Sequence, residues 1–140
     1  MRFWDTSALV PLFIREQASA RVAGYLGDDD TVVVWTLARV EFLSAVARRR
    51  RSAPSARRAL LGARRRFLDT WPSWNEVVAV EEVRRAAERL IEVHPLRAAD
   101  ALQLGAAIVA AEGDPAGLAF VTLDTNLADA AELEGFEVYR

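Results

Sequence analysis

Four acidic residues lie at positions where the expected local structure does not require an acid. Asp5 and Asp124 each directly follow a short apolar segment that has the pattern of a strand. Glu41 and Asp100 lie inside segments of helical pattern. No cation lies three or four positions from Glu41, so no ion pair within its own helix supports it. Asp100 opens an almost wholly apolar helix, where an unpaired carboxylate is costly to bury.

Each acid also has an ordinary structural explanation. Asp5 and Asp124 can cap the helices that follow them, although Thr6 and Ser7 offer hydroxyls that could cap the first helix instead. The two helical acids can form ion pairs with arginines, either from another helix or from one turn earlier in the same helix. These alternatives stay open for each residue taken singly.

Taken together, the four acids predict one metal site. The carboxyl ends of strands meet at one edge of a parallel sheet, where two of the acids would lie. Converging carboxylates repel one another and raise one another's pKa, a cost that a divalent cation removes. Oxygen ligands suit Mg²⁺ or Mn²⁺. Such a cation polarises a phosphate and lowers the pKa of a bound water, which predicts phosphodiester hydrolysis.

The composition excludes several other kinds of site. Cysteine and lysine are absent, and the single histidine is His94, beside a proline in an expected loop. Thiolate sites, a Walker P-loop, Schiff-base chemistry and a three-histidine zinc site are therefore ruled out. A phosphoaspartate receiver would use a lysine, and Ser7 stands where a phosphatase motif has its second aspartate.

The elements that must position the acids alternate along the chain. We expect strands at 3–4, 31–35, 76–80, 119–123 and 136–139 and helices at 8–14, 19–26, 37–51, 56–69, 81–92, 96–112 and 126–133. This order predicts an α/β fold with a mainly parallel sheet. A length of 140 residues, 52% of them hydrophobic, predicts a single domain over residues 1–140. No apolar run suits a membrane span or a signal peptide, so we expect a cytoplasmic protein.

Arginines are concentrated in one part of the chain. Between residues 39 and 66 there are ten arginines and a single acid, Glu41, although the whole chain has a net charge of −2. This segment could contact RNA phosphates, face an acidic protein partner, or form solvated helix faces.

Four segments resemble motifs of PIN-domain ribonucleases, specifically of VapC-type toxins from bacterial toxin–antitoxin pairs. They are residues 5–10, 39–45, 96–104 and 121–127, each around one of the four acids. The third is the most specific, and the set spans essentially the whole chain in the family's order.

The resemblance implies a Rossmann-like three-layer PIN domain and an Mg²⁺- or Mn²⁺-dependent endoribonuclease. Asp5 and Asp100 would be the surest metal ligands, with Asp124 a ligand directly or through water. Glu41 would hold metal or water and help to deprotonate the nucleophile. The expected partners are an RNA substrate, a cognate antitoxin and a second copy of the chain in a homodimer.

Other residues have smaller expected roles. Arg97 is a candidate for phosphate contact, with an ion pair to Asp100 as its alternative. Thr6 and Asn126 are candidates for orienting ligands or substrate, with capping and turns as alternatives. Gly105 stands where the family often has alanine, and we expect it to loosen its helix slightly. Two other functions remain open: a non-catalytic PIN scaffold that binds RNA or a protein, and a structure-specific DNA nuclease.

Overall fold

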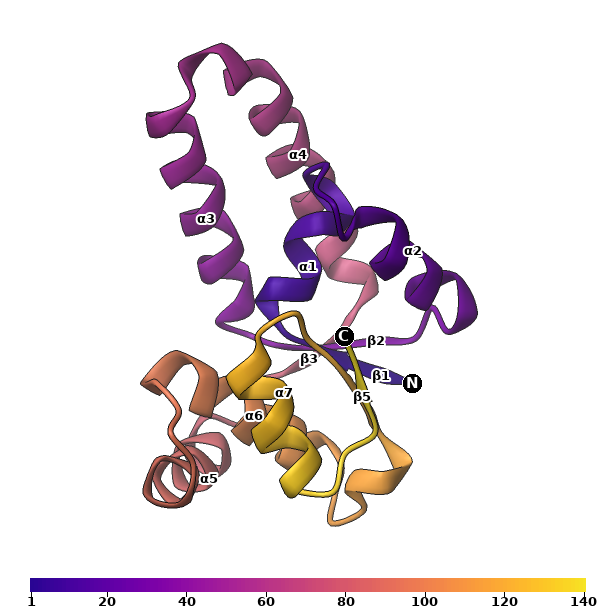
Figure 1. The fold of residues 1–140 in the computed structure, drawn as a ribbon, viewed down its shortest axis with the longest axis vertical. Helices are drawn as coiled ribbons and strands as arrows, with labels where there is room; N and C mark the ends of the chain where they lie inside the picture. The colour runs from indigo at the N-terminus through magenta and orange to yellow at the C-terminus, as the bar shows by residue number, and fades with distance from the viewer.

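A five-stranded sheet in the order β3-β2-β1-β4-β5 organises the computed structural model, which describes residues 1–140 (Figure 1). Every neighbouring pair of strands is parallel. The strands are β1 (Arg2–Trp4), β2 (Val32–Trp35), β3 (Asn75–Val77), β4 (Ala119–Val121) and β5 (Val138–Tyr139). The chain builds outward from β1 to β3 and then returns to place β4 on the other side of β1. The strand order therefore reverses between β1 and β4, the position at which sheets of this kind form a binding crevice.

The pleat of the central strands divides their side chains between two cores. Phe3 packs on one face of the sheet together with Val33 and Trp35, whereas Trp4 packs on the other with Val34. Successive side chains of a strand point to opposite faces. Because both faces are covered, β2 and β4 are continuous apolar runs without polar alternation.

Helices cover both faces of the sheet, as the three-layer fold requires (Figure 1). The Trp4 face carries α1 (Thr6–Phe13), α2 (Ser19–Asp28), α3 (Ala38–Ser52) and α4 (Arg57–Thr70). The Phe3 face carries α5 (Val80–Val93), α6 (Ala98–Ala110) and α7 (Thr125–Leu133). Short 3₁₀ turns lie at Pro54–Ala56, Trp71–Ser73 and Pro115–Gly117. No helix combines the length and the apolar character needed to cross a bilayer.

Helices α3 and α4 form a hairpin that projects away from the sheet (Figure 1). Its base is an aromatic cluster in which Phe42 stacks on Phe67 with ring centroids 3.7 Å apart. Phe13, Trp71 and Trp74 pack around this pair. The two tryptophans therefore pack against the end of α4, and these contacts hold the hairpin to α1.

Two helices begin at other residues than those expected from the sequence. Thr36 does not cap α3, whose N-cap is Leu37 without a side-chain bond, because its hydroxyl donates to Glu76 instead. Pro11 lies in the interior of α1, because that helix begins at Thr6 and not at Ala8.

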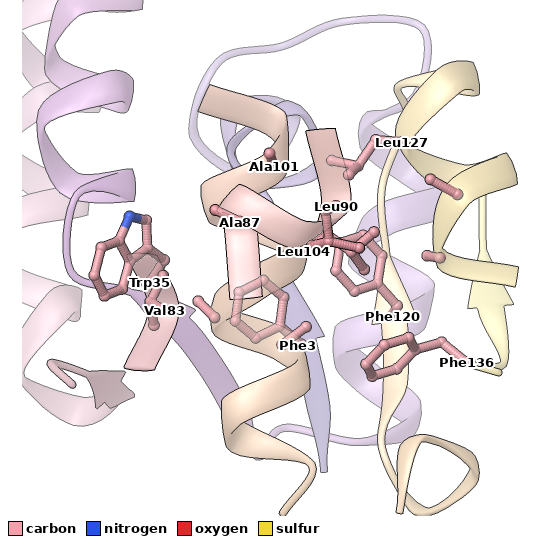
Figure 2. Close-up of a cluster of buried hydrophobic side chains, with 14 of the residues drawn as sticks. Phe3, Trp35, Val83, Ala87, Leu90, Ala101, Leu104, Phe120, Leu127 and Phe136 are labelled. Atoms are coloured by element: carbon pink, nitrogen blue, oxygen red, sulfur yellow. The ribbon is translucent and has the colours of Figure 1, made fainter. Parts of the chain in front are cut away.

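The core beneath the Phe3 face depends on close packing between α5 and α6 (Figure 2). A Cβ atom on Gly105 would lie 3.0 Å from the carbonyl oxygen of Val83 and 3.2 Å from the backbone nitrogen of Ala87. The expectation that Gly105 merely loosens its helix is therefore incomplete. The missing side chain lets the backbones of α5 and α6 approach each other.

We expect Gly105→Ala to destabilise the protein by about 1–2 kcal/mol, because the clash is with backbone atoms that cannot turn aside. That cost outweighs the gain in helix propensity of about 1 kcal/mol. The measurement is urea unfolding. Gly24→Ala is the matched control, since Gly24 is exposed within α2 with no atom within 4 Å of its added Cβ, and it should stabilise. Equal stabilisation by both substitutions would contradict the packing role of Gly105.

Candidate functional site

Asp5 lies at the carboxyl end of the central strand. Its backbone N–H donates to the carbonyl of Val121 at 3.1 Å, which continues the pairing of β1 with β4. Its carboxylate caps α1: Oδ2 accepts from the Ser7 backbone N–H at 3.1 Å and Oδ1 from the Ser7 hydroxyl at 2.7 Å. Of the alternatives left open by the sequence, the cap is therefore Asp5 and not Thr6 or Ser7. Asp5 has 5% of its surface exposed.

Burial makes the charged form of Asp5 costly. Desolvation, with a further contribution from the charge of Glu41, raises the pKa of Asp5 from 3.8 to about 6. The hydrogen bonds from Ser7 lower that pKa and compensate only in part. A rise of this size corresponds to about 3 kcal/mol against the ionised carboxylate. A cation at this position would therefore relieve an unfavourable buried charge.

Glu41 is held by two side chains and not by an arginine. Its Oε2 accepts from the Thr6 hydroxyl at 2.6 Å and from Gln103 Nε2 at 2.9 Å. Gln103 Nε2 also donates to Thr6 Oγ1 at 2.9 Å. The three residues come from α1, α3 and α6, so the network joins helices from both faces of the sheet. An ion pair with an arginine, the structural alternative for Glu41, does not form.

Gln103 is the residue of this network that sequence reasoning missed. It is 1% exposed, and its Oε1 has no hydrogen-bond partner. Exchanging the amide oxygen and nitrogen would point a carbonyl at the Glu41 carboxylate, so the observed orientation is the favourable one. The signal in the sequence was a lone polar side chain in an apolar helix, one turn after Asp100.

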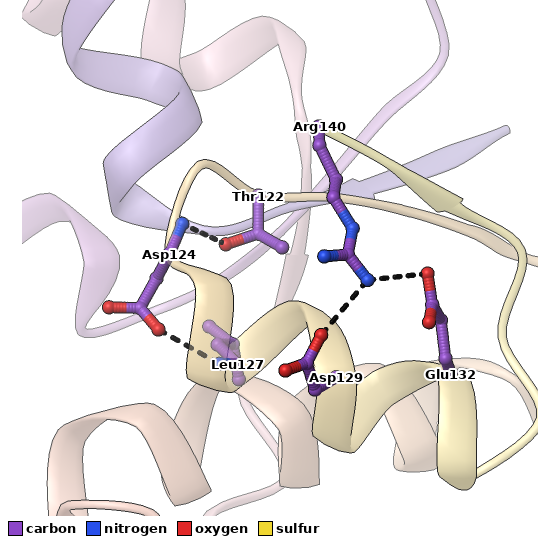
Figure 3. Close-up of polar contacts among 6 residues, drawn as sticks. All are labelled: Thr122, Asp124, Leu127, Asp129, Glu132 and Arg140. Atoms are coloured by element: carbon purple, nitrogen blue, oxygen red, sulfur yellow. Dashed lines mark hydrogen bonds and ion pairs between the residues drawn. The ribbon is translucent and has the colours of Figure 1, made fainter.

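Asp124 lies in the loop that follows β4 (Figure 3). Asp124 caps α7 through Oδ1, which accepts from the Leu127 backbone N–H at 2.8 Å. Its own N–H donates to Thr122 Oγ1 at 3.1 Å. The Ser7 hydroxyl, which donates to Asp5, accepts from the Leu123 N–H at 2.8 Å. One serine thus ties the ends of β1 and β4 together, and both strand-end acids are caps as well as site residues.

Asp100 lies in the first turn of α6 and is partly buried. Desolvation and then the negative charge of Asp124 raise its pKa, although Arg97 acts in the opposite direction. Arg97 and Asp100 form no ion pair within 4 Å, so the structural alternative for this acid is also absent. The charge of Glu41 thus contributes to the raised pKa of Asp5, and the charge of Asp124 to that of Asp100.

These residues meet at one cleft of about 940 Å³. Of the seven residues singled out from the sequence, six line it: Thr6, Glu41, Arg97, Asp100, Asp124 and Asn126. The seventh, Asp5, lies beneath the lining residue Ser7. The structure therefore brings together four acids from distant parts of the chain, with three polar or cationic residues beside them.

The donor set fits a hard divalent cation in its chemistry. All four acids supply carboxylate oxygens, the ligands that Mg²⁺ and Mn²⁺ prefer, and none of the four is paired with an arginine. As the side chains stand, no three of them are close enough to share one ion. Mg²⁺ is commonly held by one or two carboxylates and completes its coordination with water, so fewer than four direct ligands would suffice here.

Two other residues, His94 and Asp129, do not line this cleft. His94 follows α5 as its C-cap and lies 2.7 Å from Glu134, which also pairs with Arg89. Asp129 of α7 is a further acid outside the cleft, with a side chain that is 60% exposed and pairs with Arg140 at 3.1 Å (Figure 3). Glu134 and Asp129 are therefore each paired with an arginine outside the cleft.

The raised pKa of Asp5 predicts a pH-dependent cost. Because its folded-state pKa lies above the unfolded value of 3.8, its contribution to stability is complete below 3.8 and is lost as the pH rises through about 6. Asp5→Asn keeps the cap and loses the charge. We expect this variant to be more stable than the parent at about pH 8 in chelator, by up to about 3 kcal/mol, and the two to converge near about pH 4.

Urea unfolding at both pH values measures this difference. Asp30→Asn is the control, because Asp30 is an exposed loop residue, and its effect should be small. A parent that is the more stable protein at about pH 8 would show that Asp5 is not destabilised by burial.

Comparisons with known proteins agree with this architecture. The PIN domain family matches residues 2–133. Ribonuclease VapC45 of Mycobacterium tuberculosis (strain CDC 1551 / Oshkosh) is 31% identical over 136 residues, covering 97% of this chain and 92% of the relative. Ribonuclease VapC49 of Mycobacterium tuberculosis (strain ATCC 25618 / H37Rv) is similar to the same extent. With its parallel sheet, its covering helices and a match over nearly its whole length, the chain belongs to the PIN domain family.

Proposed function

We propose that this protein is an Mg²⁺- or Mn²⁺-dependent endoribonuclease that hydrolyses RNA phosphodiester bonds. The observation that carries the proposal is a cleft lined by Glu41, Asp100 and Asp124, where the strand order reverses. The buried Asp5 is hydrogen-bonded to Ser7 in the wall of this cleft, and none of the four carboxylates is paired with an arginine. Two relatives that align along almost the whole chain are named as ribonucleases, which supports the same reaction.

Each of the four acids has a role in the proposed reaction. Asp5 and Asp100 would hold the cation, and Asp124 would join them directly or through water. A bound cation would polarise the scissile phosphate and lower the pKa of the attacking water. Glu41, whose Oε2 is fixed by Thr6 and Gln103, would hold that water and accept its proton at Oε1.

Three further residues orient the reactants. Thr6 acts through Glu41, since its hydroxyl donates to that carboxylate, and is therefore a positioning residue. Arg97 and Asn126 line the cleft beside Asp100 and Asp124. In the proposed reaction Arg97 contacts a phosphate of the substrate, which arginine can bind with two parallel hydrogen bonds, and Asn126 helps to orient the bound strand.

Because four motifs resemble those of VapC-type toxins, we also propose a cellular role for this protein. The protein would act in the cytoplasm as the toxin of a toxin–antitoxin pair, as a homodimer inhibited by its cognate antitoxin. A reading frame for a small DNA-binding protein immediately upstream of this one would support that role. An unrelated operon would weaken the toxin assignment without affecting the nuclease chemistry.

We expect Asp5→Asn and Asp100→Asn each to lower RNA cleavage in Mg²⁺ or Mn²⁺ on the order of 10²- to 10³-fold, because each removes a charge that the site needs. Asp30→Asn should cleave as the parent does. The assay follows a labelled single-stranded RNA, with chelator and with DNA of the same sequence as further arms. Unaltered cleavage by either site variant would refute the assignment of the site. A parent that does not cleave RNA at all would indicate a binding scaffold. Equal cleavage of DNA would contradict specificity for RNA.

Gln103→Leu tests the network that holds Glu41. We expect it to raise the Mg²⁺ concentration needed for half-maximal cleavage by about 10- to 100-fold, as loss of a residue supporting a metal ligand does. Its unfolding midpoint should change little, because the substitution also removes the buried, unpartnered Oε1. An unchanged Mg²⁺ requirement, or loss of activity in proportion to loss of stability, would contradict the positioning role.

A further inference from the structure

The arginines of the α3–α4 hairpin are mostly without acidic partners. Among the ten arginines between residues 39 and 66, only Arg49 forms an ion pair, with Glu16. Arg66 donates to the carbonyl of Phe13 at 2.8 Å. The others have no carboxylate within 4 Å, so intramolecular ion pairing does not explain this concentration of charge.

One face of α3 connects these arginines to the acids. Glu41, Ser44, Ala45 and Arg48 all line the cleft. Their spacing of three, four and seven positions places them on a single stripe of the helix. With a rise of 1.5 Å per residue, Arg48 lies about 10 Å along the axis from Glu41. Arg51, one turn further on, continues the stripe and is exposed.

Arginines line the same cleft as the acids. Arg97 precedes Asp100 in the chain, and Arg48 lies two turns after Glu41 on α3. Arg49 also lines the cleft but is paired with Glu16. A strand with a negative charge at every nucleotide suits such a cleft, since phosphates beyond the one at the acids could meet the free arginines. An acidic protein segment could bind the hairpin but would gain nothing from running into a cleft of carboxylates.

We propose that the cleft-facing stripe of α3 guides the RNA backbone away from the acids, with Arg48 and Arg51 binding phosphates that flank the scissile one. The inference rests on the proposed function and adds a substrate path to it. Arginine suits this role because its guanidinium binds phosphate with two parallel hydrogen bonds. Arg48 lines the cleft and Arg51 extends the same stripe beyond it, whereas the arginines on α4 belong to the other helix of the hairpin and lie outside this path.

Binding without cleavage tests the path directly. Anisotropy of a labelled single-stranded RNA is measured in EDTA over a range of salt concentrations that starts low. We expect Arg48→Gln to weaken binding about three- to tenfold and to reduce the slope of log affinity against log salt by about 0.7, the value for one phosphate contact on a single strand. Adding Arg51→Gln should reduce the slope by about 0.7 again.

The matched control is Arg64→Gln with Arg65→Gln, which removes two exposed charges from α4. It should leave the slope close to that of the parent. Equal losses in the α3 and α4 variants would show a diffuse field and overturn the path, as would a parent that does not bind RNA at low salt. A polyglutamate peptide that binds in an Arg48-dependent manner, while RNA does not, would assign the stripe to an acidic protein partner.

The path and the nuclease function can fail separately. If the parent cleaves RNA but the α3 variants bind like the parent, the path is wrong and the proposed function stands. If the α3 variants lose binding as expected but the parent never cleaves with Mg²⁺ or Mn²⁺, the nuclease is wrong and the path describes a binding site.

Discussion

The buried carboxylate of Asp5 is the constraint on which the site depends. The central strand β1 is covered on both faces, so the residue at its end emerges into an environment that disfavours charge. Two hydrogen bonds from Ser7 hold the carboxylate in one orientation without abolishing that cost. The fold thus maintains an acid whose ionised form is stabilised best by something outside the chain.

Near Asp5, side-chain hydrogen bonds connect neighbouring strand ends and also connect helices on opposite faces of the sheet. Ser7 connects the end of β1 to the loop after β4. Gln103 and Thr6 connect α6 on one face to α3 on the other through Glu41. Three of the four acids, Asp5, Glu41 and Asp124, are therefore held in place by hydrogen bonds to their carboxylates.

Most of the fold and the identities of the acids could be predicted from the sequence, because they follow from strong local signals. Continuous apolar runs identified the buried strands, and Glu41 and Asp100 stood out because no helical neighbour explained them. Gln103 was missed because an amide in a helix is unremarkable until its neighbours are known. The cap of α1 stayed open between Asp5, Thr6 and Ser7 because Asp, Thr and Ser all cap well. The hydrogen bonds that hold Glu41 depend on side-chain geometry that linear spacing does not encode.

Helix α3 carries both Glu41 and the arginines of the projecting hairpin on one continuous rod, anchored at its base where Phe42 stacks on Phe67. The carboxylate lies in the first turn of this helix and the arginines at residues 48–51 lie in its last turns. A single unbroken helix therefore fixes the separation between the acidic end of the cleft and the basic part of the hairpin.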